Sequence, residues 1–86
     1  MLKNYMEVAV EIILSDILRE ESLRCQCEKC LNDIKAIALN NLKPMYVVSD
    51  EGILYTKIQE LSVQFRADII RELTIAIKKV GDNPRH

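Results

Sequence analysis

The chain has 86 residues, 49% of them hydrophobic, and its 12 basic and 13 acidic side chains give a net charge of −1. This size predicts one small domain over residues 1–86, with enough apolar side chains for a core. The balanced charge argues against direct binding of nucleic acid, because a nucleic-acid-binding domain of this size is more often clearly basic. No apolar run approaches the ~18 residues of a membrane span, so we expect no insertion into a membrane.

Residues 4–23 are predicted to form the first helix. Met6, Val10, Ile13 and Ile17 repeat at helical spacing, which indicates one buried stripe. Acidic residues interrupt this apolar stretch and no small-residue cleavage site follows it, so we expect no signal peptide and a cytoplasmic protein. Further apolar residues widen the stripe beyond what one small neighbour can cover: Tyr5, Val8, Ala9, Ile12, Leu14 and Leu18.

The segment after this helix contains all three cysteines of the chain, Cys25, Cys27 and Cys30, in the pattern Cys-x-Cys-x-x-Cys. Geometry disfavours a disulfide between the first two, and a bridge between the last two would leave an odd thiol prone to exchange. Three thiolates on one Zn²⁺ avoid both problems, and the reducing cytosol favours metal over disulfide. We predict a zinc bound by these three cysteines; the alternative is three reduced thiols without metal.

Three thiolates leave the fourth position of a tetrahedral zinc site open. Candidates for this position are a cysteine of a partner chain, Asp33, Glu28 or water, whereas His86 stands on a tail that we expect to be loose. An open position would suit a catalytic zinc, but no histidine or general base stands nearby in the sequence. We therefore favour a structural zinc that ties the first loop to the second helix or links two subunits.

A second helix is predicted to begin at Cys27 or Glu28 and to end at the two consecutive asparagines before Pro44. Asparagine tolerates a left-handed cap, and proline prevents the helix from continuing. Residues 43–49 are predicted to be extended, because tyrosine and valine favour that backbone. For Tyr46 we favour packing at the end of the bundle, with its hydroxyl on a backbone carbonyl, over contact with a ligand.

The last and longest helix is predicted from Ile53 or Thr56 to Val80. Gly81 is expected to stop it as a left-handed residue, and residues 82–86 are expected to form a disordered tail. The predicted buried stripe of this helix consists of Leu54, Ile58, Leu61, Phe65, Ile69, Leu73, Ala76 or Ile77, and Val80.

The length of this last helix, about 25 residues or ~38 Å, exceeds the ~30 Å diameter of a compact subunit of this size. Apolar residues also lie off its main stripe, at Val63, Ile70 and Ile75. Packing against a symmetry mate is the simplest way to bury both sides. We therefore predict an all-α fold of three to four helices that assembles as a two-fold homodimeric bundle.

Sequence patterns typical of catalysis are missing. The two glycines, Gly52 and Gly81, stand far apart, so the sequence has no glycine-rich phosphate loop. With a single histidine at the end of the chain, we expect no enzymatic activity. Lys57, Gln64 and Arg66 have side chains that suit phosphates and guanine edges, although the same residues also fit an ordinary solvated helix surface.

A combined pattern within residues 4–80 consists of Cys25-x-Cys27-x-x-Cys30-x-x-Asp33-Ile34, Ala36-x-Ala38-Leu39-Asn40-x-Leu42-x-Pro44-x-Tyr46-Val47 and Tyr55-x-Lys57. This pattern resembles that of the late competence protein family ComFB. The resemblance implies an all-α homodimer with zinc on the cysteine cluster, acting as a small non-enzymatic regulator of bacterial competence or motility through protein partners. It also implies a receptor for cyclic di-GMP; the alternative is a zinc-stabilised structural adaptor of the competence machinery without a nucleotide. Side-chain chemistry then suggests four nucleotide-binding candidates: Tyr46, Lys57, Gln64 and Arg66.

Overall fold

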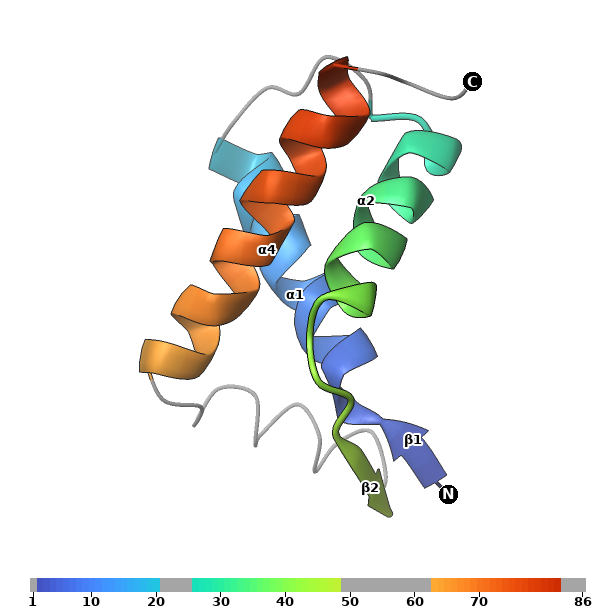
Figure 1. The fold of residues 1–86 in the computed structure, drawn as a ribbon, viewed down its shortest axis with the longest axis vertical. Coiled ribbons are helices and arrows are strands. Elements are labelled where there is room, and N and C mark those ends of the chain that lie inside the picture. Colours follow the sequence, from blue (N-terminus) through green and yellow to red (C-terminus); the bar gives the residue numbers. More distant parts are fainter. Residues whose placement is uncertain (1, 21–25, 49–62, 83–86) are drawn as a thin grey trace.

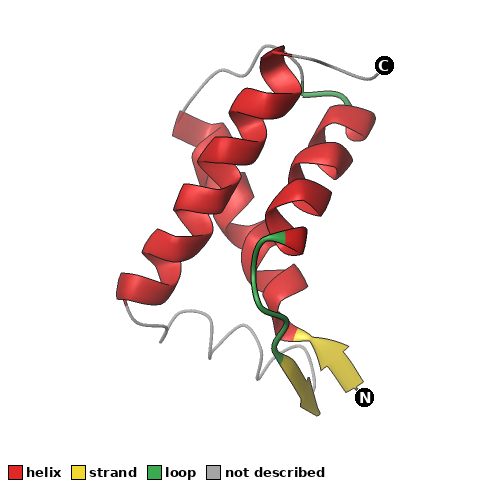
Figure 2. Ribbon diagram, in the orientation of Figure 1, coloured by secondary structure: helices red, strands yellow, loops and turns green. Residues whose placement is uncertain are grey.

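The computed structural model describes residues 2–20, 26–48 and 63–82. Within these ranges the chain forms three helices and one pair of short strands (Figures 1 and 2). Each helix packs against the other two, and α1 lies behind α2 and α4 in the view of Figure 1. In chain order the elements are β1 (Leu2–Asn4), α1 (Tyr5–Glu20), α2 (Glu28–Asn40), β2 (Tyr46–Val48) and α4 (Val63–Asp82).

The core lies between the three helices, as the helical periodicity predicts. Met6, Val10 and Ile13 of the first predicted stripe are buried, while Ile17 is only partly buried against the core. No polar or charged residue of the described ranges is buried, so the core is held by apolar burial and packing rather than by a polar network. The buried residues form one cluster: Tyr5, Met6, Ala9, Val10, Ile13, Leu14, Cys30, Ile34, Ala38, Ile69, Leu73, Ala76 and Val80.

The prediction of an all-α fold is wrong in one respect, because β1 and β2 form a two-stranded antiparallel sheet. The register places Leu2 opposite Val48 and Asn4 opposite Tyr46. Extended backbone after Pro44 is confirmed over residues 46–48. A strand before the first helix was not predicted, since a three-residue segment has no period of its own and gains a partner only through the fold.

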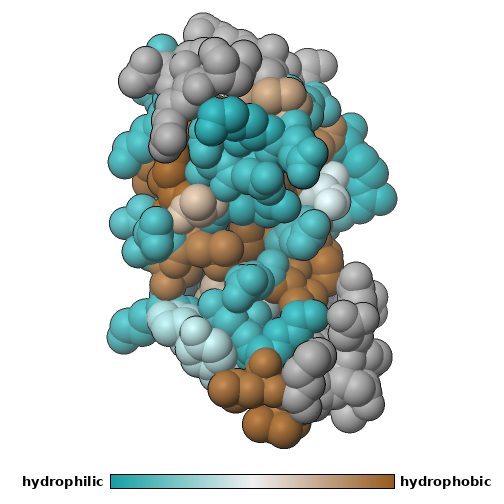
Figure 3. Space-filling model, turned by 90° about the vertical axis from the view of Figure 1, so that its right-hand side faces the viewer, coloured by the Kyte–Doolittle hydropathy of each residue, from teal (hydrophilic) through white to brown (hydrophobic). Residues whose placement is uncertain are grey.

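Side-chain alternation gives this strand pair one inner and one outer face. Val47 packs against the core, whereas Leu2, Tyr46 and Val48 are exposed. Apolar side chains therefore gather at the lower end of the molecule in Figure 3, where the strands lie. The predicted packing of Tyr46 inside the bundle is wrong: its exposed fraction is 63%, because the residue falls on the outward side of the pleat.

The helix ends differ in detail from the predictions. Cys27 is the N-cap of α2, as expected, but the C-cap Asn41 has φ −110° and ψ 10°, which is not left-handed. Its backbone N–H instead bonds to the carbonyls of Ala38 and Leu39. α4 continues through Gly81 to Asp82, and no glycine in the described ranges has a positive φ. The predicted glycine stop is therefore wrong, and the expected start of this helix before Val63 lies outside the described residues.

None of the helices in the described part of the chain is long and apolar enough to cross a membrane.

The side chain of Asn4 joins the start of α1 to the strand pair. Its Oδ1 accepts hydrogen bonds from the backbone N–H groups of Met6 at 3.1 Å and Met45 at 2.9 Å. The backbone N–H of Tyr5 donates to the Met45 carbonyl as well, at 2.6 Å. One side chain thus caps a helix and fixes a segment that lies 41 positions later in the sequence.

Replacing Asn4 with alanine is therefore expected to lower the free energy of unfolding by about 1–2 kcal/mol, since it removes the N-cap of α1 and one long-range bond. Urea unfolding monitored by circular dichroism measures this change. Asn41→Ala is the matched control, because Asn41 Nδ2 donates only to the exposed carbonyl of Ile37 one turn earlier. Equal losses in the two variants would contradict the role of Asn4 as a tie between distant segments.

Candidate functional site

The cysteine cluster stands at the start of α2. Cys27 has extended backbone, φ −68° and ψ 160°, and its Sγ accepts a hydrogen bond from the backbone N–H of Cys30 at 3.4 Å. This is the bond that an N-cap side chain makes to the first turn. The Cys27 side chain is exposed, whereas Cys30 is 1% exposed and belongs to the core. Cys25, the third predicted ligand, lies outside the described residues.

The helix end has the chemistry that thiolate ligands need. Free backbone N–H groups and the positive end of the helix dipole stabilise a thiolate at the N-cap. A shallow depression beside it is lined by Cys27, Glu28, Lys29, Asn32 and Asp33. Two predicted candidates for the fourth ligand, Glu28 and Asp33, are thus brought to the side of Cys27. Within the described ranges, no three Cys, His, Asp or Glu side chains converge on one point, and the predicted set includes Cys25 outside those ranges.

The predicted nucleotide-binding residues are only partly brought together. Gln64 and Arg66 both lie in the first turn of α4, but residues two positions apart differ by about 200° around a helix and so face different sides. Tyr46 lies on β2, at the same end of the bundle but on the opposite side in Figure 1. Lys57 is outside the described residues.

Both α4 candidates already bind carboxylates of the chain itself. Gln64 Nε2 donates to Asp68 Oδ1 at 2.8 Å, and an Arg66 Nη2 atom lies 3.8 Å from Asp16 Oδ2 on α1. Asp16 also pairs with Arg19. Arg66 therefore sits where α1 and α4 meet, held by an exposed ion pair of the kind that contributes little to stability.

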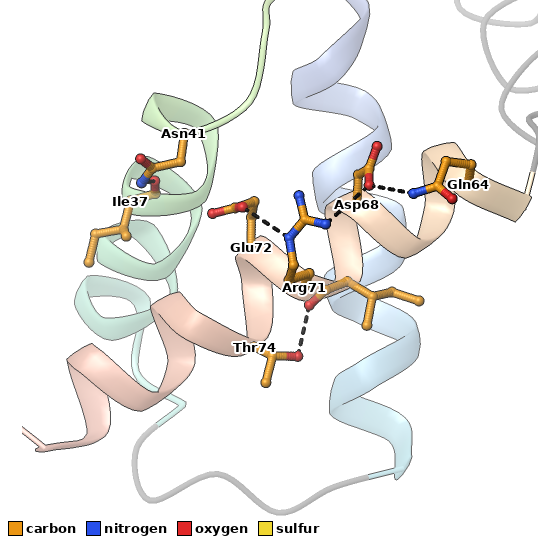
Figure 4. Close-up of polar contacts among 8 residues, drawn as sticks. Ile37, Asn41, Gln64, Asp68, Arg71, Glu72 and Thr74 are labelled. Carbon is orange, nitrogen blue, oxygen red and sulfur yellow. Dashed lines mark hydrogen bonds and ion pairs between the residues drawn. The ribbon is translucent and has the colours of Figure 1, made fainter.

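A polar network on α4 was not predicted. Arg71 lies between Asp68 and Glu72: its Nη1 is 3.3 Å from Asp68 Oδ1 and its Nε is 3.4 Å from Glu72 Oε2. The carboxylate of Asp68 also accepts the hydrogen bond from Gln64 (Figure 4). Thr74 Oγ1 donates to the carbonyl of Ile70 at 2.7 Å. Spacings of three and four residues are the signal that could have revealed the bonds from Gln64 and Arg71 to Asp68 and from Thr74 to Ile70, whereas Arg71 and Glu72 are adjacent in the sequence.

Comparison with known proteins identifies the family. The profile of the late competence development protein ComFB matches residues 3–84. The chain belongs to the ComFB family. The competence protein ComFB of Bacillus subtilis (strain 168) is 29% identical over 84 residues, which cover 98% of this chain and 86% of the relative. The solved structure of the late competence protein ComFB from Bacillus subtilis matches with a TM-score of 0.83 and 28% identity, covering 99% of this chain and 93% of that one.

This result confirms the resemblance found in the cysteine, proline and tyrosine pattern. ComFB proteins take their name from late competence development rather than from a catalysed reaction. The match extends over nearly the whole length of this chain and its relatives. A role related to competence therefore applies to the domain as a whole and does not rest on one motif.

Proposed function

We propose that this ComFB-family protein is a non-enzymatic, zinc-binding regulatory homodimer of the cytoplasm that acts in bacterial competence or motility. It binds cyclic di-GMP and passes that state to a protein partner. The observation that carries the proposal is the family match over residues 3–84. Two features of the structure also support the proposal. Cys27 and Cys30 lie at the N-terminus of α2, and Arg66 is held only by an exposed ion pair with Asp16.

The zinc is proposed to bind Cys25, Cys27 and Cys30, with Asp33 or Glu28 of the same helix as a fourth ligand. The position of Cys27 at the N-cap supports this set, because the helix end lowers the cost of forming its thiolate. Both acidic candidates border the depression beside Cys27. A zinc in this place would tie the start of α2, and the loop before it, to the core through Cys30.

For the ligand, Arg66 is the residue whose surroundings best support a phosphate contact. A guanidinium binds phosphate through paired charge-assisted hydrogen bonds, which are stronger than its 3.8 Å pair with Asp16. Binding would move Arg66 from Asp16 to the phosphate and so change a contact between α1 and α4. A two-fold symmetric dinucleotide suits a two-fold dimer, since each subunit can present the same groups to one half.

Calorimetric titration of the zinc-loaded full chain with cyclic di-GMP tests this function. We expect saturable heat and a loss of affinity of about tenfold or more in Arg66→Ala, since a charge-assisted bond is worth about 1.5–3 kcal/mol. Lys79→Ala removes a cation near the other end of the same helix and is expected to bind normally. Absence of heat at about 1 mM ligand, where a binding free energy of about −4 kcal/mol gives half-saturation, would refute the receptor role.

The second candidate is a zinc-stabilised structural adaptor of the competence machinery without a nucleotide ligand. The contacts of Gln64 with Asp68 and of Arg66 with Asp16 favour it, because each side chain already has a partner within the subunit. This function predicts a protein partner whose capture by the immobilised protein is the same with and without cyclic di-GMP. Together with an absence of heat in the titration, that result would replace the receptor by the adaptor.

A further inference from the structure

Cys27 and Cys30 are the two described members of the cysteine cluster, and both are thiols in this structure. They lie one turn apart at the start of α2, at the upper end of that helix in Figure 1. Their surroundings differ. Cys27 is exposed, whereas Cys30 is 1% exposed and its side chain belongs to the core. The proposed zinc site uses both sulfur atoms as equivalent ligands and leaves this difference without a role.

The first turn of α2 brings these two residues within the reach of a disulfide. The Leu31 N–H donates to the Cys27 carbonyl at 3.0 Å, so the backbone between the cysteines is already helical. A rise of about 1.5 Å per residue and a Cα radius of about 2.3 Å place their Cα atoms about 5 Å apart, inside the range of about 4.4–6.8 Å that disulfides span. Cys27 Sγ also lies on the side of Cys30, whose backbone N–H donates to it at 3.4 Å.

We propose that Cys27 and Cys30 form a redox pair, which a small-molecule disulfide such as glutathione disulfide converts to an intramolecular disulfide. The exposed Cys27 reacts first with the oxidant, and the buried Cys30 then closes the bond. This inference depends neither on the proposed zinc nor on the proposed nucleotide, because it uses only the two thiols and the helix that spaces them.

The reaction consists of two thiol–disulfide exchanges. In the first, Cys27 Sγ loses its proton to water and attacks one sulfur of glutathione disulfide, which breaks that S–S bond and releases one glutathione thiolate. In the second, Cys30 Sγ loses its proton and attacks Cys27 Sγ of the mixed disulfide, and the second glutathione leaves as a thiolate. Each leaving thiolate takes up a proton. The two cysteines thus lose two electrons and two protons, and glutathione disulfide gains them as two thiols.

Burial determines the order of the two exchanges, because the rate of exchange depends on access to the attacking sulfur. Cys27 borders the surface depression beside Glu28 and Asn32, where a small molecule can approach. Cys30 is covered by the core, which keeps an external oxidant away but leaves its neighbour one turn earlier within reach. An exposed cysteine next to a second cysteine that resolves its first product is the usual arrangement of a redox-sensing thiol.

The disulfide and a zinc ion exclude each other at this site, because the metal ligand is the thiolate and a disulfide has none. Oxidation of Cys27 and Cys30 is therefore expected to release zinc from the wild type, and a reductant is expected to restore its binding. Zinc retained by the oxidised chain would overturn the redox pair. Disulfide formation in a chain that binds no zinc even when reduced would support the pair and refute only the metal site.

The test uses the full chain with Cys25→Ser, stripped of metal by a chelator, so that Cys27 and Cys30 are its remaining thiols. Incubation with glutathione disulfide is expected to remove two hydrogen atoms per chain, measured by intact mass, without adding glutathione. Trypsin cleaves after Lys29, so the disulfide should join peptides 25–29 and 30–35 until a reductant is added. A lasting glutathione adduct, a link between two chains or two unreacted thiols would overturn the pair.

The wild type shows whether the third cysteine changes the pairing. After the same oxidation, remaining thiols are alkylated and the chain is digested with trypsin. We expect Cys27 to be joined to Cys30 and Cys25 to carry the alkyl group. A disulfide that uses Cys25 in place of either residue would overturn the assignment.

Two further variants, each made with Cys25→Ser, test the order of reaction. Cys30→Ala is expected to stop at the mixed disulfide between Cys27 and glutathione. Cys27→Ser keeps a good N-cap residue, and its Cys30 is expected to react with glutathione disulfide about tenfold or more slowly than in the same variant unfolded in urea, because reaction requires local opening of the core. Circular dichroism confirms that both variants are folded. Equal rates of adduct formation in the two folded variants would contradict the assigned roles.

Discussion

Replacing Cys27 with serine is expected to remove the zinc-dependent part of the stability and to leave the fold of α2 intact. Serine is among the best N-cap residues, so it can accept the bond from the Cys30 N–H that Cys27 Sγ accepts now. It is a poor ligand for zinc compared with a thiolate. The free energy of unfolding of the zinc-loaded wild type is expected to exceed that of the variant by several kcal/mol, since binding of a structural zinc contributes about 10–16 kcal/mol in small peptides.

Thermal unfolding with and without a chelator measures this difference, and elemental analysis of the purified protein counts the metal. Chelator should lower the melting temperature of the wild type to that of Cys27→Ser and should leave the variant unchanged. The serine keeps the cap, so a loss in the variant is attributable to the metal and not to the helix end. Zinc-free wild-type protein whose melting ignores chelator would overturn the proposed metal site.

Truncating Leu73 to alanine is expected to lower the free energy of unfolding by about 2–5 kcal/mol, because it opens a cavity in a closely packed core. Leu73 lies in the middle of α4 and is 0% exposed. Small domains have a total stability of only about 5–15 kcal/mol, so this one change removes a large share. Urea unfolding followed by circular dichroism gives the value.

Ile75→Ala is the control for this measurement. Ile75 stands two positions along the same helix and is 43% exposed. Truncating it removes apolar area that water already contacts in part, so the expected loss is below about 1 kcal/mol. Similar losses for Leu73→Ala and Ile75→Ala would mean that the two faces of α4 do not differ in burial.

The helices could be predicted well because their signal is local and repeated. Apolar residues at spacings of three and four mark the buried face over several turns, and the core stripe of α4 from Ile69 to Val80 is confirmed on this basis. The start of α2 could be predicted equally well, since Cys27 supplies the N-cap and Glu28 places a carboxylate in the first turn. Each of these signals needs only neighbours within one or two turns.

The features that were missed depend on residues far apart in the chain. β1 has only three residues and becomes a strand through its pairing with β2. The exposure of Tyr46 follows from which face of that pair meets the core, and the pairing of Arg66 with Asp16 follows from how α4 crosses α1. Local sequence patterns do not specify how two helices cross or which two strands pair.

The sequence by itself determined the helices, their apolar faces, the cysteine pattern and the family, because each of these features depends on residues that are close together in the chain. Only the tertiary structure decided that Asn4 joins Met45 and that Cys30 is buried while Cys27 is exposed. Burial is a property of the assembled helices, since a side chain loses its contact with water only when another element covers it.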